Sequence, residues 1–286
     1  MLKALDRNIA AASERIVFLA PSMAAVSDVF EHVDVDRDRH HRLVREAQRL
    51  RGSIYLKDGA IREEHLSPGG LHQTPEDETS WHMLLLNRDQ QVSACALYTE
   101  HDHAVTFEGL RVGHSALAHD ETWRHALRNA IESELATVRR HKLKYVELGG
   151  WAVSEESRGT AGPMALALAV WGFGLRRGGA LGMTTATFRH CSATILKRLG
   201  GSRFDVDGTM LPPYFDPRYG CMMEVLRFDS RKPVRKYLGL IDQVRDALHK
   251  IPVVACPAPH PADVKVSAFS LLSPGNSGFA LEALAS

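Results

Sequence analysis

The stretch Val146–Pro163, VELGGWAVSEESRGTAGP, decides how this sequence folds. It begins as an apolar strand that ends near Val153 and continues as a loop of small residues. The almost wholly apolar run 161–177 follows and predicts a long helix. The first backbone N–H groups of a helix have no partner inside it, and the helix dipole places partial positive charge there. The order of strand, loop and helix therefore predicts an anion-binding turn.

The loop has the residue types that a phosphate requires. Gly159, Thr160, Ala161 and Gly162 are small enough for a phosphate to approach the backbone, and Arg158 adds a bidentate donor. No Gly-Lys-Ser/Thr follows, so the loop is not a Walker loop, and GTAG does not have the GxGxxG spacing of a dinucleotide-binding turn. An ordinary strand-to-helix turn with a surface arginine is the alternative interpretation.

Two adjacent glycines, Gly149 and Gly150, lie inside the strand. Glycines within a strand predict a bulge or a close backbone approach. A bulge would separate this strand from its neighbour just ahead of the loop. A pantetheine arm could enter the resulting slot and pair with free strand groups.

Helices alternate with strands in the second half of the chain and hairpins dominate the first half, which predicts a mixed α/β (α+β) sheet with helices on both faces. The expected strands are 15–20, the hairpin 81–86 and 91–98, 103–112, 144–153, 180–187, 202–206 and 219–228. The expected helices run from Ser22 with an interruption to about Arg51, over 120–141 with Asp120 as N-cap, and over 161–177, 189–199 and 233–250. We expect one domain over 1–252 and a poorly ordered Pro/Ala/Ser-rich tail over 253–286.

Composition narrows the class of protein. The 286 residues include 35 Lys and Arg against 34 Asp and Glu, a net charge of +1, which excludes a strongly basic DNA-coating protein. No apolar run reaches the roughly 18 residues that a membrane-spanning helix needs, and charges interrupt the apolar N-terminal stretches, so no signal peptide is predicted. The four cysteines stand singly, and without an export signal we interpret them as reduced thiols in a cytoplasmic protein.

No metal site is predicted. The chain has no CxxC, and the histidines at 40–41 and 101–103 lack a surrounding carboxylate or cysteine framework. Cys191 beside His190 does not predict a thiol nucleophile, because adjacent helical residues point about 100° apart.

The strand, loop and helix resemble motif A of the GNAT (GCN5-related N-acetyltransferase) superfamily, in which a bulged strand precedes an Arg/Gln-x-x-Gly-x-Gly/Ala loop. Glu156 stands at the first position of that loop, and Arg158 directly precedes the glycine, as is common in the superfamily. The downstream stretch TTATFRHCSATILKRLGGSRF is similar to the second motif. There, Arg189 or His190 takes the place of the usual Asn, and residues 196–197 take that of the usual Tyr. The resemblance implies a GNAT-like fold.

A narrower resemblance covers more of the chain. Residues 47–98, the strand with Glu147, and the stretch 212–233 (PPYFDPRYGCMMEVLRFDSRKP) are similar to N-acyl amino acid synthases and, more distantly, to acyl-homoserine-lactone synthases. Those GNAT-fold enzymes take a fatty acyl group from acyl carrier protein. Glu147 matches the Glu of their strand, which shortly precedes an Arg-aromatic pair, whereas Gly150-Trp151 stands in the place of that pair here.

The resemblance implies acyl transfer from a phosphopantetheine thioester, as acyl-CoA or acyl carrier protein, to an amine. Glu147 is the leading candidate to bind or deprotonate the amine, and partial burial would raise its pKa toward a useful range. Trp151 and Val153 are expected to line the donor channel beside the loop Arg158–Gly162. The alternatives are a solvent-facing salt bridge for Glu147 and a core position for Trp151.

Three residues are candidates to contact the acceptor: Trp81 and His82 at the start of the hairpin strand, and Arg189. Core or surface positions are the alternative for Trp81 and His82. An acidic acyl carrier protein would need a basic landing surface, or the same residues could form a solvated charged face. The candidates for that surface are Arg176, Arg177, Arg231, Lys232, Arg235 and Lys236.

Three functions remain open. The first is a fatty acyltransferase that makes an N-acyl amino acid or a similar amide. The second is an acetyl-CoA-dependent N-acetyltransferase acting on a small amine. The third is a non-catalytic thioester-binding module on a GNAT scaffold, since a fold does not determine its function. A long apolar tunnel beside the bulged strand would favour the first, and a closed pocket the second.

Overall fold

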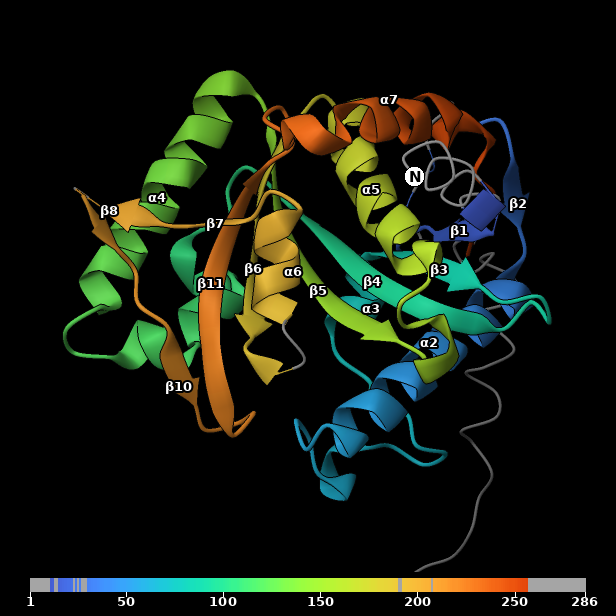
Figure 1. Ribbon diagram of the computed structural model, residues 1–286, viewed down its shortest axis with the longest axis horizontal. Coiled ribbons are helices and arrows are strands. Elements are labelled where there is room, and N and C mark those ends of the chain that lie inside the picture. Colours follow the sequence, from blue (N-terminus) through green and yellow to red (C-terminus); the bar gives the residue numbers. More distant parts are fainter. Residues whose placement is uncertain are drawn as a thin grey trace, which may run out of the picture.

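The computed structural model describes residues 11–12, 15–22, 24, 26, 30–189, 192–206 and 208–256. A mixed sheet of ten strands runs through it in the order β10-β11-β6-β5-β4-β3-β1-β12-β2, with β7 beside β11 (Figure 1). The strands are β1 Ile16–Leu19, β2 Val33–Val35, β3 Trp81–Leu86, β4 Val92–His101, β5 Lys144–Val153, β6 Ala180–Thr187, β7 Ser202–Arg203, β10 Tyr214–Asp216, β11 Cys221–Asp229 and β12 Val253–Ala255. A small second sheet pairs β8 Asp205–Val206 with β9 Thr209–Met210.

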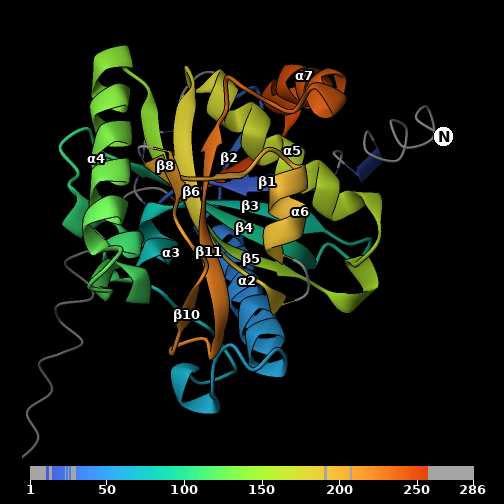
Figure 2. The ribbon, with the colours of Figure 1, turned by 60° about the vertical axis from the view of Figure 1, so that its left-hand side comes forward.

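Helices cover both faces of the sheet, as predicted. The helices are α2 Arg37–Lys57, α3 Glu76–Thr79, α4 Arg124–His141, α5 Ala161–Arg176, α6 Ser192–Arg198 and α7 Leu238–Ala247, with 3-10 turns η1 Glu63–His65, η2 Phe107–Gly109, η3 Arg111–His114, η4 Ala116–His119, η5 Glu155–Ser157, η7 Arg235–Tyr237 and η8 Leu248–Lys250. Figure 2 shows α4 on one side of β6 and β11, and α5 and α6 on the other. No helix among the described residues is long and apolar enough to cross a membrane.

Separate apolar cores form on the two faces. On one face, α5 and α7 pack on β3 and β4 through side chains such as Leu166, Phe173 and Ile241. On the other face, α4 packs on β5, β6 and β11, and α2 packs on β1, β3 and β4. β5 and β6 lie between these cores and contribute side chains to both faces.

The predicted strand at 103–112 is wrong. The Asp102 side chain accepts a hydrogen bond from the backbone N–H of Ala104 (2.7 Å), and this Asx turn ends β4. The chain then continues as η2 and η3. This departure matters because it brings the N–H groups of η3 to β5.

Two predicted boundaries are also wrong. Residues 253–255, assigned to the tail, form β12, which pairs in parallel with β1 (Phe18 opposite Val253) and with β2. Their side chains are buried in the sheet, so the folded part extends past residue 252; residues 257–286 lie outside the described residues. The helix expected to end near Arg51 continues to Lys57.

Helix starts differ from prediction as well. α2 begins at Arg37, where Asp36 is the N-cap and its side chain accepts a hydrogen bond from the N–H of Arg39. Asp120 accepts hydrogen bonds from Thr122 and Trp123 in the turn ahead of α4 rather than capping it directly.

Candidate active site

The neighbouring strands β5 and β6 part in mid-sheet. Their parallel pairing runs from Lys144 opposite Ala180 to Glu147 opposite Met183 and is not found farther along the described strands. Beyond that point β5 stays paired with β4 as far as Val153, and β6 stays paired with β11 as far as Thr187. Figure 1 shows the two strands diverging. The predicted splay is therefore present, and it starts at Glu147.

A bulge in β5 lies beside this gap, also as predicted. Cys95 is opposite Ala152 whereas Leu97 is opposite Gly149, so β5 has one extra residue here. Gly150 has φ +59°, a conformation that favours glycine, and a Cβ there would lie 2.6 Å from the Leu97 side chain. Both constraints make glycine necessary at this position.

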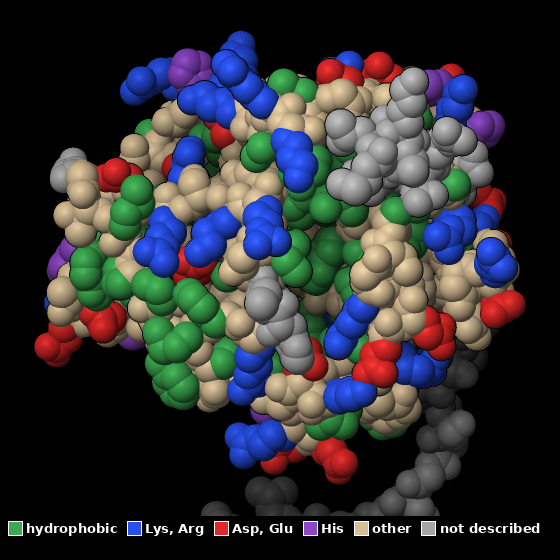
Figure 3. All heavy atoms as spheres, in the orientation of Figure 1, with side chains coloured by type: hydrophobic (Ala, Val, Ile, Leu, Met, Phe, Trp, Pro, Cys, Tyr) green, Lys and Arg blue, Asp and Glu red, His purple; other side chains and the backbone are tan. Residues whose placement is uncertain are grey.

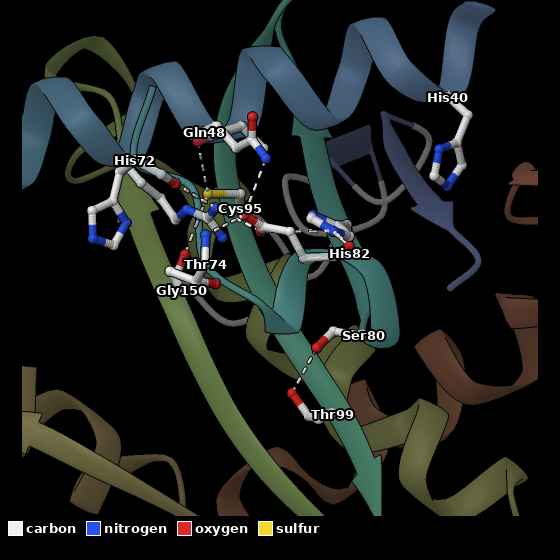
Figure 4. Close-up of polar contacts among 12 residues, drawn as sticks. His40, Gln48, His72, Thr74, Ser80, His82, Cys95, Thr99 and Gly150 are labelled. Carbon is white, nitrogen blue, oxygen red and sulfur yellow. Dashed lines mark hydrogen bonds and ion pairs between the residues drawn. The ribbon is translucent and has the colours of Figure 1, made fainter. Parts of the chain in front are cut away.

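A buried polar network supports the bulge from the α2 side (Figure 4). The side chain of Arg51 is 1% exposed and its Nη2 donates to Asp77 Oδ1 at 2.6 Å. Gln48 donates to the same carboxylate, and the Cys95 thiol donates to the carbonyl of Gly150 at 3.3 Å. These contacts connect α2 with α3 and hold the carbonyl of Gly150 in a partly buried hydrogen bond.

The predicted phosphate-binding loop connects β5 to α5. Arg158 and Gly159 are exposed, and Gly159 has φ +75°. Thr160 is the N-cap of α5, and its hydroxyl accepts a long hydrogen bond, 3.3 Å, from the N–H of Gly162. Within the described part of the chain, the N–H groups of Gly159 and Ala161 have no hydrogen-bond partner.

Two arginines from other segments lie beside this loop. A pocket is lined by the loop residues Gly159 to Gly162 together with Ala11, Ala12, Arg15 and Arg88. Arg15 precedes β1 and Arg88 lies in the turn of the β3–β4 hairpin. Sequence reasoning missed both arginines, because no local signal joins positions so far apart. Backbone donors and two guanidinium groups around one pocket are suited to a phosphate or pyrophosphate.

An apolar cavity of about 100 Å³ lies between α5 and the parting strands. It is lined by β4, β5, β6, α5, α6 and β11 side chains, among them Leu148, Trp151, Val170, Leu199 and Phe228. Figure 3 shows hydrophobic side chains in a hollow between α6 and α5. Trp151 is 37% exposed and thus lies at the edge of the cavity rather than in the core, while Val153 packs against the core on the α5 face.

Glu147 points to the opposite face of β5 and is 2% exposed, so it is not a solvent-facing residue. Its carboxylate accepts hydrogen bonds from His101 Nε2 (3.0 Å) and from the backbone N–H groups of Arg111 (3.1 Å) and Val112 (3.3 Å). Burial raises its pKa, but the His101 hydrogen bond and the charge and N–H of Arg111 outweigh burial, so the pKa is lower than usual. The expectation of a raised pKa is wrong, and the group remains a carboxylate.

Arg111 is the second residue that sequence reasoning missed on this face. Its guanidinium lies over Gly149, where a Cβ would be 2.6 Å from Nη1. It thus brings positive charge to the strand position next to Gly150-Trp151. The turn that carries Arg111 was predicted as a strand, which is why it was overlooked.

Three predicted acceptor contacts are not brought to this site. Trp81 is 5% exposed and packs in the core against Phe173 at a centroid distance of 5.1 Å. His82 is 1% exposed and bonds to the Asp77 carbonyl. All six residues of β3 are buried, so no side of this strand faces a substrate. Core positions, the alternative, are correct for both residues.

Arg189 has a bridging position instead. Its Nη1 donates to the carbonyl of Asp58 at 2.7 Å, and its Nη2 donates to that of Gly220 at 3.1 Å. It therefore ties the end of α2 to the turn between β10 and β11, and both of its Nη atoms already donate to backbone carbonyls. Residues 190–191, including Cys191, lie outside the described residues.

The predicted landing surface for acyl carrier protein lies at the other end of α5. Arg176 is the last residue of that helix, about 24 Å from the phosphate-binding loop at 1.5 Å per residue. Arg177 makes a bidentate ion pair with Glu100, and Arg231 one with Asp229. Lys232, Arg235 and Lys236 are exposed. The basic side chains beside the loop are those of Arg15, Arg88 and Arg158.

One group of described residues has spacing suited to a metal ion. Ligand atoms of His40, His41 and Cys256 lie within 4.8 Å of one another. His41 and Cys256 approach to 3.7 Å between Nε2 and Sγ. The group lies near the start of α2, whereas Tyr55 near its end contacts the bulge through the Trp151 carbonyl. It is therefore remote from the candidate active site.

The burial of His82 predicts a pH-dependent stability. Burial, only partly offset by the hydrogen bond to Asp77, lowers the pKa of His82 from 6.5 to about 4. The unfolded chain therefore binds a proton that the folded chain does not, and stability that is full above pH 6.5 is lost as pH falls toward 4. Between pH 7.5 and pH 5 the loss from this group is on the order of 2 kcal/mol. Urea unfolding at pH 7.5 and pH 5 measures it.

The matched variant is His82→Gln. His40 and His72, whose pKa values burial also lowers, contribute in the same direction, so the variant should retain part of the pH dependence. An equal difference between the two pH values in wild type and variant would show that His82 does not titrate on unfolding.

Comparisons with known proteins agree with this geometry. No family model and no curated protein matches the chain. Among solved structures, the chain is similar to BjaI, a CoA-dependent acyl-homoserine lactone synthase solved with MTA, at 14% identity and a TM-score of 0.51 over 89% of this chain and 99% of that chain. The structure of BjaI with SAM and isopentyl-CoA has 14% sequence identity and a TM-score of 0.50, over 89% of this chain and 99% of that chain. FeeM, an N-acyl amino acid synthase from uncultured soil microbes, has 14% sequence identity and a TM-score of 0.41, over 65% of this chain and 90% of that chain.

The chain thus has a GNAT-like mixed α/β fold, as the sequence predicted. In particular, its fold resembles that of an acyl-homoserine lactone synthase over nearly the full length of that protein.

Proposed function

We propose that this chain is an N-acyltransferase that moves a fatty acyl group from a phosphopantetheine thioester directly to the amine of an amino acid or another small amine. The observation that carries the proposal is the apolar cavity beside the parted strands, reached from the same face of β5 as the phosphate-binding loop. An acetyl group would not need such a cavity, whereas an alkyl chain gains from burial there.

The donor's parts match successive parts of this face. Its phosphates fit the pocket of Gly159 to Gly162, Arg15 and Arg88. The pantetheine arm of the donor fits along β5 beyond Glu147. There the edge of β5 that faces β6 is no longer paired, so its backbone N–H and C=O groups can form hydrogen bonds with the arm. The acyl chain then fits the cavity under α5. Acyl-CoA and acyl carrier protein share the arm and its first phosphate, so both are donors for this proposal.

The reaction needs orientation more than covalent catalysis, because a thioester is already activated. The neutral amine nitrogen attacks the thioester carbonyl, the C–N bond forms, and the C–S bond breaks. Starting from an ammonium, two protons leave the nitrogen: the thiolate takes one and solvent takes the other. An N–H group on the parted stretch of β5 is available for the developing oxyanion.

Narrowing the cavity tests the acyl chain assignment. Val170→Phe adds a ring to the cavity lining, so kcat/KM for decanoyl-CoA should fall about tenfold or more, while that for acetyl-CoA changes less than about twofold. The matched control is Val35→Phe, at a residue 63% exposed on β2. Rates are measured by thiol release with a mixture of amino acids as acceptors.

The other outcomes identify the alternatives. Turnover of acetyl-CoA with none of decanoyl-CoA would make the chain an N-acetyltransferase. Tight donor binding without thiol release or amide formation would make it a binding module. Equal losses with both donors in Val170→Phe would show that the cavity does not hold the acyl chain.

A further inference from the structure

We infer that the acceptor is an α-amino acid and that Arg111 binds its carboxylate at the gap, on the face of β5 opposite the acyl cavity. The inference rests on the proposed function and names its second substrate. Three observations support it: where the guanidinium lies, how its turn is held, and which groups around it remain without partners.

The guanidinium lies against the backbone where the two strands have just parted. A Cβ on Gly149 would be 2.6, 2.7 and 3.0 Å from Nη1, Nη2 and Cζ of Arg111, so glycine at this position gives the guanidinium its place. Gly149 also lines the apolar cavity from the other side. A molecule held by Arg111 is thus within one strand's thickness of the expected thioester.

The turn that carries Arg111 is held by the buried carboxylate of Glu147. This carboxylate accepts from two successive backbone N–H groups, those of Arg111 and Val112. It is itself fixed by His101. Glu147 therefore acts as a positioning residue for Arg111, and its own oxygens are occupied.

The guanidinium donors of Arg111 remain available. The donors in question are those of the two Nη atoms, because Nε is buried and forms long ion pairs with Glu147 at 3.8 Å and Glu76 at 3.9 Å, both longer than a hydrogen bond. Among the described residues neither Nη atom has a hydrogen-bond partner, and the side chain is 38% exposed. A planar fork of this kind matches a carboxylate in bidentate geometry.

Glu76 makes the site suited to an α-amino acid rather than to a simple anion. Its carboxylate, 24% exposed, forms a long ion pair with Arg111, with Oε1 3.9 Å from Nε, and makes no hydrogen bond to it. A cation and an anion next to each other match the carboxylate and ammonium of one zwitterion. An amine without a carboxylate would leave the Nη donors of Arg111 without a hydrogen-bond partner, and an acid without an ammonium would meet Glu76 unfavourably.

The test compares amino acids with the amines that lack their carboxylate. L-leucine against 3-methylbutylamine, and L-phenylalanine against 2-phenylethylamine, are assayed as acceptors with decanoyl-CoA. In Arg111→Gln, kcat/KM for the amino acids should fall about 10- to 100-fold, mostly through KM, and that for the amines should change less than about threefold. Arg111→Lys should recover part of the loss. The control is Arg124→Gln, an exposed arginine on α4.

Calorimetric titration of L-leucine and L-phenylalanine into the wild type and Arg111→Gln, without donor, separates this inference from the proposed function. If binding depends on Arg111 but no acyl transfer occurs, the inference stands and the proposed function fails. If transfer occurs and Arg111→Gln affects amino acids and amines equally, or neither, the inference is wrong and the proposed function stands. The inference is also wrong if the titration detects no amino-acid binding and the kinetics show no preference for amino acids over amines.

Discussion

Arg158→Glu is expected to weaken binding of decanoyl-CoA by at least about 100-fold while the protein remains folded. Arg158 is exposed and directly precedes Gly159, which lines the pocket together with Arg15 and Arg88. Charged hydrogen bonds contribute about 1.5–3 kcal/mol each, and the substitution also adds repulsion against the phosphates. Since the side chain is exposed, its replacement should cost little stability.

Calorimetric titration with decanoyl-CoA and with decanoyl acyl carrier protein measures this loss. The control is Arg140→Glu, which makes the same charge change at an exposed position near the end of α4. Circular dichroism melting of each variant checks the fold. Unchanged affinity in Arg158→Glu, with either donor, would refute the assignment of this loop to the donor's phosphates.

Glu147→Gln is expected to reduce kcat/KM with an amino acid by about 10- to 100-fold and to leave donor affinity within about threefold. The amide has one acceptor oxygen where the carboxylate served three donors, so His101 or the N–H groups of Arg111 and Val112 would lose a partner. An unpaired buried group costs about 1–3 kcal/mol, and the turn that carries Arg111 would move. The proposed donor site lies on the opposite face of β5, so donor affinity should persist.

Steady-state kinetics and donor titration on one preparation test this expectation. Glu132→Gln, at an exposed carboxylate of α4, is the matched control. Wild-type rates in Glu147→Gln would remove Glu147 from any role in turnover. A parallel loss of donor affinity would show that the carboxylate supports the whole sheet rather than the acceptor face.

The sequence predicted those parts of the fold that local patterns determine. The β3–β4 hairpin, the bulge and the order of β5, loop and α5 follow from apolar periodicity and from Gly149-Gly150. The prediction of a strand over 103–112 was wrong. Apolar and polar residues alternate there as in a strand, but the Asx turn at Asp102 redirects the backbone. Whether a turn competes successfully with sheet pairing depends on the groups it meets in three dimensions.

The candidate site was predicted less completely. Its loop residues could be recognised because they are consecutive, and Glu147 because it lies on the same strand. Arg15, Arg88 and Arg111 come from distant segments, and without the folded sheet nothing relates them to the loop or to the gap. Trp81 and His82 were misplaced because a strand buried on both faces shows no alternation from which its orientation could be deduced.

The parting of β5 and β6 means that the sheet can be approached from two sides at one place. If the donor occupies the α5 side and the amino acid the side of Arg111, the two molecules use different entrances. Neither then has to dissociate for the other to arrive, and the order of their arrival is free. Such an enzyme works through a complex that holds both substrates together and has no need to store the acyl group on one of its own side chains.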